Sequence, residues 1–476
     1  MPFPAHKTKI VCTIGPASDS PEILERMIRA GMNIARLNFS HGDFESHADT
    51  IRKIRAAAEA TERRVAIMAD LPGPKIRIGE LKAELIELEA NDTFTLTTED
   101  IIGHQSRVSV SFARLPKAVK PKDKLFLNDG LIELEVIKVE GVEVQCKVIV
   151  GGPLRSRKGL NLPDIDLGIS AFTERDYRCL KFAMQNDVDA VSQSFVETAM
   201  DIKAVRRAAK DLGHDPFIIA KIERIGARNH IDDILDAADG IMIARGDLGV
   251  EIPIEKMAHA QKLLMNKANL AGKPVITATQ MLESMSHSRR PTRAEATDVA
   301  NAILDGTDCV MLSGESAMGE YPVHATNMLA RIAADIEPHR TVNPIGGKLR
   351  SRREYDDKKV EDLIALCVET ILERITPPIV IVPTRSGATA RRITRYRLPV
   401  WITAFSRFEK TCQDLLFSYG VQPVCEPDHP DDWKQCARNL LLNVGEVGHL
   451  VVLTEGPSEK HPDRNNRVEI LDLSRT

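Results

Sequence analysis

The chain has 476 residues, of which 43% are hydrophobic and 28% charged, and its formal net charge is −4. This length predicts two or three domains, and the composition argues against disorder and against sequence-independent nucleic-acid binding. No apolar run approaches the roughly 18 residues of a membrane span, and the first residues lack the apolar core of a signal peptide. We therefore expect a cytoplasmic protein with neither nucleic acid nor membrane as partner. Eight scattered cysteines show no metal-ligand spacing, which predicts reduced structural thiols.

Short apolar, β-branched runs alternate with longer amphipathic runs along the first two thirds of the chain. This alternation is typical of βα units around a parallel sheet, and eight such units predict a (β/α)8 TIM barrel. The predicted strands are residues 9–14, 33–38, 65–70, 189–195, 217–222, 240–245, 274–279 and 308–313.

About a hundred residues separate the third and fourth predicted strands, far more than a βα connection needs. Alternating patterns such as TFTLTTE and RVSVSF, joined by turn residues, predict an inserted all-β domain there. Because it leaves the barrel at the C-terminal end of a strand, where barrel enzymes keep their active sites, we expect a lid. A polar linker over 342–359 precedes a C-terminal open α/β domain. The predicted boundaries are 1–72 and 168–344 for the barrel A domain, 73–167 for the B lid and 345–476 for the C-terminal effector domain.

Polar residues gather just after six of the predicted barrel strands, at the rim where the active sites of this fold lie. One polar residue at a strand end carries little information, because strand ends face water. Six sets at one rim indicate a site. They are Arg36, Asn38, Ser40 and His41; Asp70; Lys221 and Glu223; Arg245, Gly246 and Asp247; Thr279 and Gln280; and Ser313, Gly314 and Glu315.

Two carboxylates and a lysine in these sets suit phosphoryl transfer. Glu223 and Asp247 follow neighbouring strands and could hold Mg²⁺, which takes one or two protein carboxylates and fills its other positions with water and substrate oxygens. Lys221 precedes Glu223 by two residues, so both side chains face the same side of an extended segment. The alternatives are that Asp247 is a helix N-cap and that Lys221 only forms a salt bridge with Glu223. Arg36 and Arg245, expected to converge on the same place, favour phosphate binding.

The chain resembles the pyruvate kinase family from end to end. The resemblance is carried by TKIVCTIGPAS, GMNIARLNFSHG, GPKIR, KIERIGA, IMIARGDLGVEIP, VITATQMLESM, RPTRAEATDVANAILDGTDCVMLSGE and TRSGATAR. It implies transfer of the phosphoryl group of phosphoenolpyruvate to ADP, giving pyruvate and ATP in the last step of glycolysis. It also implies Mg²⁺ or Mn²⁺ as the metal, held by Glu223 and Asp247, and a homotetramer.

The resemblance also implies a role for each matching residue. Lys221 is similar to the lysine that stabilises the phosphoryl group in transfer, and Arg36 to the arginine that bridges substrate and nucleotide phosphates. Thr279 lies beside the substrate carboxylate, and a water ordered by Thr279 or Ser313 is one candidate proton donor for the enolate. The expected catalytic residues are Lys221, Arg36 and Thr279; the substrate-binding residues are Arg36, Gly246, Asp247, Thr279 and Ser313; the nucleotide-binding residues are Asn38, His41, Arg77 and Lys158.

One position departs from many members of the family. They bind potassium through groups matching Asn38, Ser40, Asp70 and the carbonyl of the next residue, and they carry glutamate five places after the aspartate. In this chain the residue after Asp70 is Leu71, and the residue five places after Asp70 is Lys75 instead of glutamate. Because an ammonium has the charge of the ion, we expect Lys75 to take its electrostatic role and K⁺ not to be required. The alternative is that Lys75 only solvates the lid hinge.

The stretch TRSGATAR follows a predicted strand and opens a helix, so its amides, hydroxyls and helix dipole could bind an anion. An ordinary N-cap is the alternative. Because the family binds an effector in this loop, and the final loop EGPSEKHPDRNN differs from that of animal fructose-bisphosphate-activated forms, we expect a sugar monophosphate or a nucleotide monophosphate. The expected effector residues are Thr384, Arg385, Ser386, Gly387, Ala388 and Thr389.

Two other functions are compatible with this fold. A non-catalytic sensor of phosphoenolpyruvate or a sugar phosphate would be expected to have lost the lysine, a metal carboxylate or the bridging arginine, and this chain has them all. A synthase acting through a phosphohistidine would need a swivelling domain with a histidine in a Gly- and Thr-rich loop, which the sequence lacks.

Overall fold

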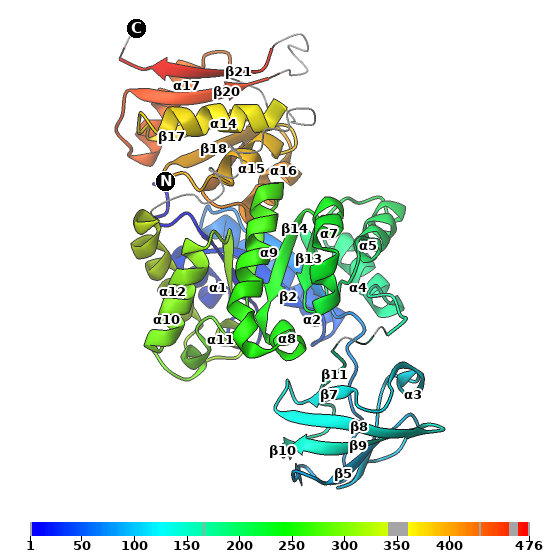
Figure 1. Ribbon diagram of the computed structural model, residues 1–476. Helices are drawn as coiled ribbons and strands as arrows, with labels where there is room; N and C mark the ends of the chain where they lie inside the picture. The colour runs from blue at the N-terminus through cyan, green and yellow to red at the C-terminus, as the bar shows by residue number, and fades with distance from the viewer. Residues whose placement is uncertain are drawn as a thin grey trace.

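The computed structural model describes residues 2–163, 165, 167–340, 360–427, 430–456 and 465–474. A helix-covered barrel lies in the middle, with a small β domain at one end and a second α/β layer at the other (Figure 1). No helix in these ranges is both long enough and apolar enough to cross a membrane.

The barrel is closed and all-parallel, in the order β1-β16-β15-β14-β13-β12-β3-β2. All eight predicted strands are confirmed, with ends that match or shift by one or two residues. They are β1 (Lys9–Thr13), β2 (Met32–Asn38), β3 (Ala66–Leu71), β12 (Ala190–Gln193), β13 (Phe217–Ile222), β14 (Gly240–Ala244), β15 (Val275–Ala278) and β16 (Cys309–Leu312). The main helices of the barrel are α1 (Pro21–Ala30), α2 (Phe44–Ala60), α4 (Glu174–Gln185), α5 (Ala199–Asp211), α7 (Ile231–Ala237), α9 (Met257–Ala271), α10 (Arg293–Leu304) and α12 (Pro322–Ile336).

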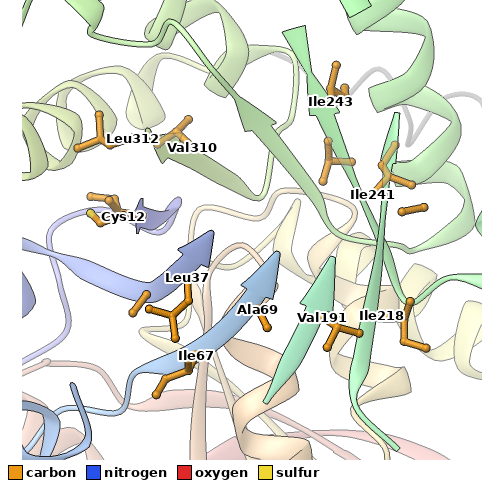
Figure 2. Packing of buried hydrophobic residues seen from close by; sticks show 14 of the residues in the cluster. Cys12, Leu37, Ile67, Ala69, Val191, Ile218, Ile241, Ile243, Val310 and Leu312 are labelled. Carbon is orange, nitrogen blue, oxygen red and sulfur yellow. The ribbon is translucent and has the colours of Figure 1, made fainter. Parts of the chain in front are cut away.

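The strands read as continuous apolar runs because both faces of the barrel wall are buried. Residues such as Leu37, Ile67 and Val310 point outward into the layer under the helices (Figure 2). Their neighbours Met68 and Met311 belong to a separate cluster inside the barrel. Helix starts are fixed locally as well, since capping boxes begin several helices, including α4, α5 and α10.

The C-terminal domain closes the barrel at the N-terminal end of its strands. Phe417 is fully buried, and its ring stacks on Phe217, the first residue of β13, with 5.1 Å between centroids. Asp308, next to the start of β16, pairs with Arg397 of the C-terminal domain at 2.6 Å, and both side chains are buried. This end of the barrel is therefore packed against the C-terminal domain.

The inserted domain lies between β3 and β12 and packs around its own core. A six-stranded sheet in the order β11-β7-β8-β9-β5-β6 and a β10-β4 pair confirm the predicted β domain. Its strands are β4 (Ile86–Leu88), β5 (Thr93–Thr97), β6 (Arg107–Ser109), β7 (Lys124–Leu127), β8 (Ile132–Glu140), β9 (Glu143–Val150), β10 (Gly152–Leu154) and β11 (Leu160–Asn161). One helix of four residues, α3 (Leu115–Ala118), was not predicted, because a single turn is too short to show a helical period.

The C-terminal domain is the expected open sheet, in the order β19-β18-β17-β20-β21, parallel except for β21. Its elements are α14 (Val360–Leu372), β17 (Ile379–Pro383), α15 (Ala388–Thr394), β18 (Trp401–Ser406), α16 (Glu409–Asp414), β19 (Val421–Cys425), α17 (Trp433–Val444), β20 (Leu450–Glu455) and β21 (Arg467–Asp472). The predicted linker and the 344/345 boundary lie outside the described residues, as does most of the loop after β20. The boundaries at 72/73 and 167/168 stay predictions. All eight cysteines are free thiols, as expected.

Replacing Phe417 by alanine should lower the free energy of unfolding by about 3–5 kcal/mol, because it removes a ring that packs in the interior of the barrel from the neighbouring domain. Urea unfolding followed by circular dichroism measures the change. Val447→Ala, at a side chain that is 93% exposed, is the control and should stay within about 0.5 kcal/mol of wild type. Equal losses in the two variants would contradict the role given to Phe417.

Candidate active site

The buried carboxylate of Asp70, the penultimate residue of β3, organises the rim. Its Oδ2 accepts hydrogen bonds from Nε and Nη2 of Arg36 at 3.0 and 2.5 Å, and its Oδ1 accepts one from Ser192 Oγ at 2.7 Å. The ammonium of Lys221 lies 3.3 Å away. Burial alone would raise the pKa of Asp70, but Lys221, Arg36 and the Ser192 hydroxyl together lower it, so the carboxylate is ionised.

Lys221 projects from β13 into a ring of acceptors. Its Nζ lies 2.8 Å from Glu223 Oε1 and donates to Ser194 Oγ at 2.7 Å. Burial tends to lower the pKa of this ammonium, but Asp70 and Glu223 outweigh it and raise the pKa above its ordinary value. The salt bridge that the sequence left as an alternative is present. The same contacts hold a permanent positive charge at the rim, where a phosphate could meet it.

Glu223 and Asp247 face each other closely enough to interact. Burial raises the pKa of Glu223; Lys221 opposes this, and the charge of Asp247 adds to the rise. A buried carboxylate beside a second, partly exposed one favours a bound cation, and oxygen ligands suit a hard divalent metal. In the described part of the chain no three His, Cys, Asp or Glu residues gather in a metal-binding group, so a metal here would rely on this pair, water and substrate.

Asp247 lies in the first turn of α8 (Arg245–Glu251), whose capping residue Ala244 forms no side-chain cap hydrogen bond. The N-cap alternative for Asp247 is therefore wrong. The carboxylate instead lies 3.4 Å from the ammonium of Lys75.

The loop after β15 has a constrained backbone. Thr279 has φ +68° and Gln280 φ +53°, a left-handed conformation that a β-branched residue rarely adopts. Thr279 Oγ1 accepts the Gly246 amide at 2.7 Å, and Arg245 Nη2 donates to the carbonyls of Thr279 and Gln280 at 2.8 and 3.3 Å. Nη1 of Arg245 also pairs with Asp298 at 2.6 Å. The predicted convergence of Arg245 on a phosphate is thus wrong, because these acceptors turn its guanidinium toward the loop.

At the end of β16, the fully buried Glu315 accepts the amides of Ser313 and Leu282 at 2.7 and 3.1 Å. It holds the strand end against the neighbouring loop. Ser313 remains partly exposed at the rim.

A basic cluster surrounds His41, on the side of the rim next to the inserted domain. Burial lowers the pKa of His41, and the charges of Arg77, Arg36, Lys75 and Arg175 lower it further. A neutral imidazole among cations suits a polyphosphate. Of the other nucleotide residues expected, Asn38 accepts the Ser40 amide through Oδ1 at 3.2 Å, and Lys158 lies across from Ile78 at the base of the inserted domain.

The groups expected to surround a monovalent cation are otherwise engaged. The carbonyl of Leu71 accepts the Ser194 hydroxyl at 2.7 Å, and Asp70 is bonded to Arg36, Lys221 and Ser192. The structure places the Lys75 ammonium against Asp247 rather than among Asn38, Ser40, Asp70 and Leu71. The physical reason is that the oxygens of Asp70 already have three donors, which leaves Asp247 as the carboxylate within reach.

The loop predicted to bind an effector connects β17 to α15. Helix α15 has Gly387 as its N-cap, with φ +77° and no side-chain cap hydrogen bond. The effector site stays a prediction beside the alternative of an ordinary helix start. The hydroxyl of Thr384 accepts the Gly387 amide at 2.9 Å, and the carbonyl oxygens of Arg385 and Ser386 accept from Thr411 and Arg391. The loop is thus held in shape through its backbone.

Sequence reasoning missed Ser192 of β12, which bonds Asp70, and Ser194, the second residue after Ser192, which bonds Lys221. They stand inside DAVSQSF, which was interpreted only as a strand. Two serines at alternate positions of a buried strand are the signal that could have found them.

Comparisons with known proteins agree with this geometry. The pyruvate kinase barrel-domain family matches residues 5–326, and the pyruvate kinase alpha/beta-domain family matches residues 362–471. A pyruvate kinase of Thermococcus litoralis is 48% identical over 459 residues, 96% of each chain, and one of Thermotoga maritima is 40% identical over 98% of this chain and 100% of its own. The crystal structure of a pyruvate kinase from Cryptosporidium parvum superposes with a TM-score of 0.91 at 36% identity, covering 98% of this chain and 96% of its own. None of these findings supports the sensor alternative, and the chain belongs to the pyruvate kinase family.

Proposed function

We propose that the residues at this rim transfer the phosphoryl group of phosphoenolpyruvate to ADP, which gives pyruvate and ATP. The observation that supports the assignment best is the fixed charge of Lys221, held between Asp70 and Glu223 beside a pair of carboxylates. Such a transfer has little covalent chemistry for the protein to perform, so positioned charges account for most of the catalysis.

Lys221 meets the equatorial oxygens of the phosphoryl group in transfer, and Arg36 bridges the two substrates. Asp70 fixes the direction of both cations before any substrate arrives. Glu223 and Asp247 would hold Mg²⁺, with Mn²⁺ as a substitute; when bound, this ion offsets negative charge on the phosphoryl oxygens and orients them.

The substrate carboxylate binds at the start of α8. There the Gly246 amide donates to Thr279 Oγ1, and the Thr279 hydroxyl donates in turn to the Ala278 carbonyl, so a carboxylate that takes this amide binds beside Thr279. A water ordered by Thr279 or Ser313 then delivers the proton that converts the enolate to pyruvate, because a hydroxyl alone is a poor acid.

ADP binds on the side of the inserted domain. Arg77 and Lys158 contact its phosphates from the base of that domain, and Asn38 and His41 contact it from the end of β2. Closure of the inserted domain over this side would exclude water from the transfer.

Lys221→Ala should lower kcat roughly 10³-fold while KM for phosphoenolpyruvate stays within a few-fold of wild type, because it removes a charge that acts chiefly in the transition state. A lactate-dehydrogenase-coupled assay measures both constants. Lys267→Ala, at a partly exposed lysine of α9 paired with Asp232, is the control and should behave as wild type. If Lys221→Ala keeps wild-type turnover, the mechanism is refuted.

We also propose that K⁺ is not required, because Lys75 supplies a monovalent charge to the rim. Its contact with Asp247 gives this charge a different position from that of the ion, but keeps it beside the substrate phosphates. The ammonium compensates one of the two carboxylates, so the rim has a monovalent positive charge in the absence of the ion.

Wild-type turnover in sodium- and potassium-free buffer should therefore change less than about twofold when K⁺ is added. Lys75→Glu should lose at least roughly tenfold in activity without K⁺ and recover part of it when K⁺ is added, because the charge beside Asp247 is reversed. Lys82→Glu makes the same charge change at an exposed site of the inserted domain and should have neither effect. A wild-type enzyme that works only with K⁺ would refute the role of Lys75 and leave the kinase assignment intact.

The loop over 384–389 is proposed as the site of a sugar monophosphate or nucleotide monophosphate effector, with its partly exposed hydroxyls and amides as donors. A homotetramer in the cytosol is the assembly that family membership favours. Both stay predictions.

A further inference from the structure

Helix α8 contacts the inserted domain at two points. One is the ion pair between Asp247 and Lys75, a residue at the start of that domain, at 3.4 Å. The other is at Val250, three residues after Asp247 and therefore beside it on the helix surface. The neighbouring stripe of the helix, Leu248 and Glu251, is buried. The stripe with Asp247 and Val250 is thus turned toward the inserted domain, which lies on the same side of the barrel as α8 (Figure 1).

The partner of Val250 is the tight turn between β7 and β8. Its residues Asn128, Asp129 and Gly130 have φ of +52°, +57° and +88°, so three successive residues adopt a left-handed backbone. Asn and Asp tolerate this conformation, and glycine adopts it without strain. A Cβ placed on Gly130 would lie 3.3 and 3.5 Å from Cγ2 and Cγ1 of Val250. Glycine at this position therefore allows both the turn and its close approach to α8.

The same turn is bonded to the residues expected to hold ADP. The Asn128 amide donates to the Gly159 carbonyl at 3.3 Å. Gly159 forms a β-bridge with Arg77, and the carbonyl of Lys158 accepts the Ile78 amide at 2.9 Å. Because these are backbone bonds of neighbouring strands, we expect the turn, Arg77 and Lys158 to move as one unit.

We propose that Gly130 and Val250 are positioning residues for the nucleotide. Their contact docks the inserted domain on α8 and so fixes Arg77 and Lys158 relative to Asp247. This inference rests on the proposed function, in which Arg77 and Lys158 bind ADP and Asp247 binds the metal. Neither Gly130 nor Val250 has a side-chain donor or acceptor, so the contact acts through shape alone.

Docking determines what fraction of the protein is ready to bind ADP. A nucleotide that needs both α8 and the inserted domain binds only molecules in which the two are docked, so its apparent affinity scales with that fraction. Phosphoenolpyruvate is expected to bind groups of the barrel alone. A change at Gly130 or Val250 should therefore raise KM for ADP and spare KM for phosphoenolpyruvate.

The first test is steady-state kinetics of the full chain. Gly130→Ala should raise KM for ADP at least roughly fivefold, because the added methyl group presses on Val250, and should change kcat and KM for phosphoenolpyruvate less than about twofold. Gly141→Ala is the matched control. Gly141 is also a left-handed glycine of the inserted domain, with φ +60°, but a Cβ placed on it has no neighbour within 4 Å.

Two changes at Val250 separate a positioning role from a folding defect. Val250→Ala removes both Cγ atoms, and the Cβ of this residue lies at an ordinary 3.8 Å from the Cβ placed on Gly130. Adding Val250→Ala to Gly130→Ala should therefore return KM for ADP to within about twofold of the Gly141→Ala control. Val250→Phe enlarges the other partner at a partly exposed position and should raise KM for ADP as Gly130→Ala does. It decides if Gly130→Ala fails to fold.

The second test is a cross-link, which needs no activity. The distance of 3.8 Å between the two Cβ positions lies within the roughly 3.5–4.5 Å of a disulfide. In Gly130→Cys/Val250→Cys, oxidised glutathione should convert the two thiols to a disulfide and be reduced to two glutathione thiols. Peptide mapping by mass spectrometry identifies the bond among the native cysteines. Gly141→Cys/Val250→Cys is the control pair and should not form it.

A cross-link in the first pair only, together with a rise in KM for ADP that Val250→Ala relieves, supports the proposal. The proposal is overturned by a missing cross-link, or by a KM for ADP in Gly130→Ala and Val250→Phe equal to that of Gly141→Ala, while the kinase assignment stands. If wild type forms no pyruvate, the proposed function is refuted, and with it the role of the two residues, whatever the cross-link shows.

Discussion

The ionised carboxylate of Asp70 lies 2% exposed at the rim of the barrel, bonded by two cations and a hydroxyl that come from three different strands. A buried charge is tolerated only when its partners are placed well, so the network resists any rearrangement that would leave Asp70 unpaired. Arg36 and Lys221 thereby receive fixed directions, and Glu223 is held in turn by Lys221 and the Phe195 amide. The rim is preorganised because its charges fix one another.

The rest of the rim also contains two kinds of residue. Some can contact substrate, and others fix the position of those residues. Arg245 holds the left-handed backbone of Thr279 and Gln280, and Glu315 ties the end of β16 to the neighbouring loop. These residues are as polar as the residues that can contact substrate, but their hydrogen-bond donors and acceptors are bonded to other groups of the protein. The strained backbone at Thr279 persists because this surrounding network fixes it.

The fold was predictable because each signal was local and repeated. Eight buried strands are eight β-branched runs, and the parallel arrangement of a barrel brings their ends to one rim whatever lies between them. The direction of each long side chain was not predictable. Arg245 and Lys75 each reach several acceptors, and only the positions of Asp298 and Asp247 in space decide between them. The closure of the barrel by Phe417 was also hidden, since an aromatic residue in a C-terminal domain gives no sign of the domain whose core it joins.

The position of Phe417 affects how the chain acquires its structure during synthesis. The last barrel strand, β16, ends at Leu312, but the ring that fills the N-terminal end of the barrel comes about a hundred residues later. A ribosome that releases the chain from its N-terminus exposes all eight strands before the ring that completes their interior has been made. The barrel must therefore wait, with an open apolar end, until the C-terminal domain emerges. A chain that stops short of that domain is an unfinished barrel rather than a smaller enzyme.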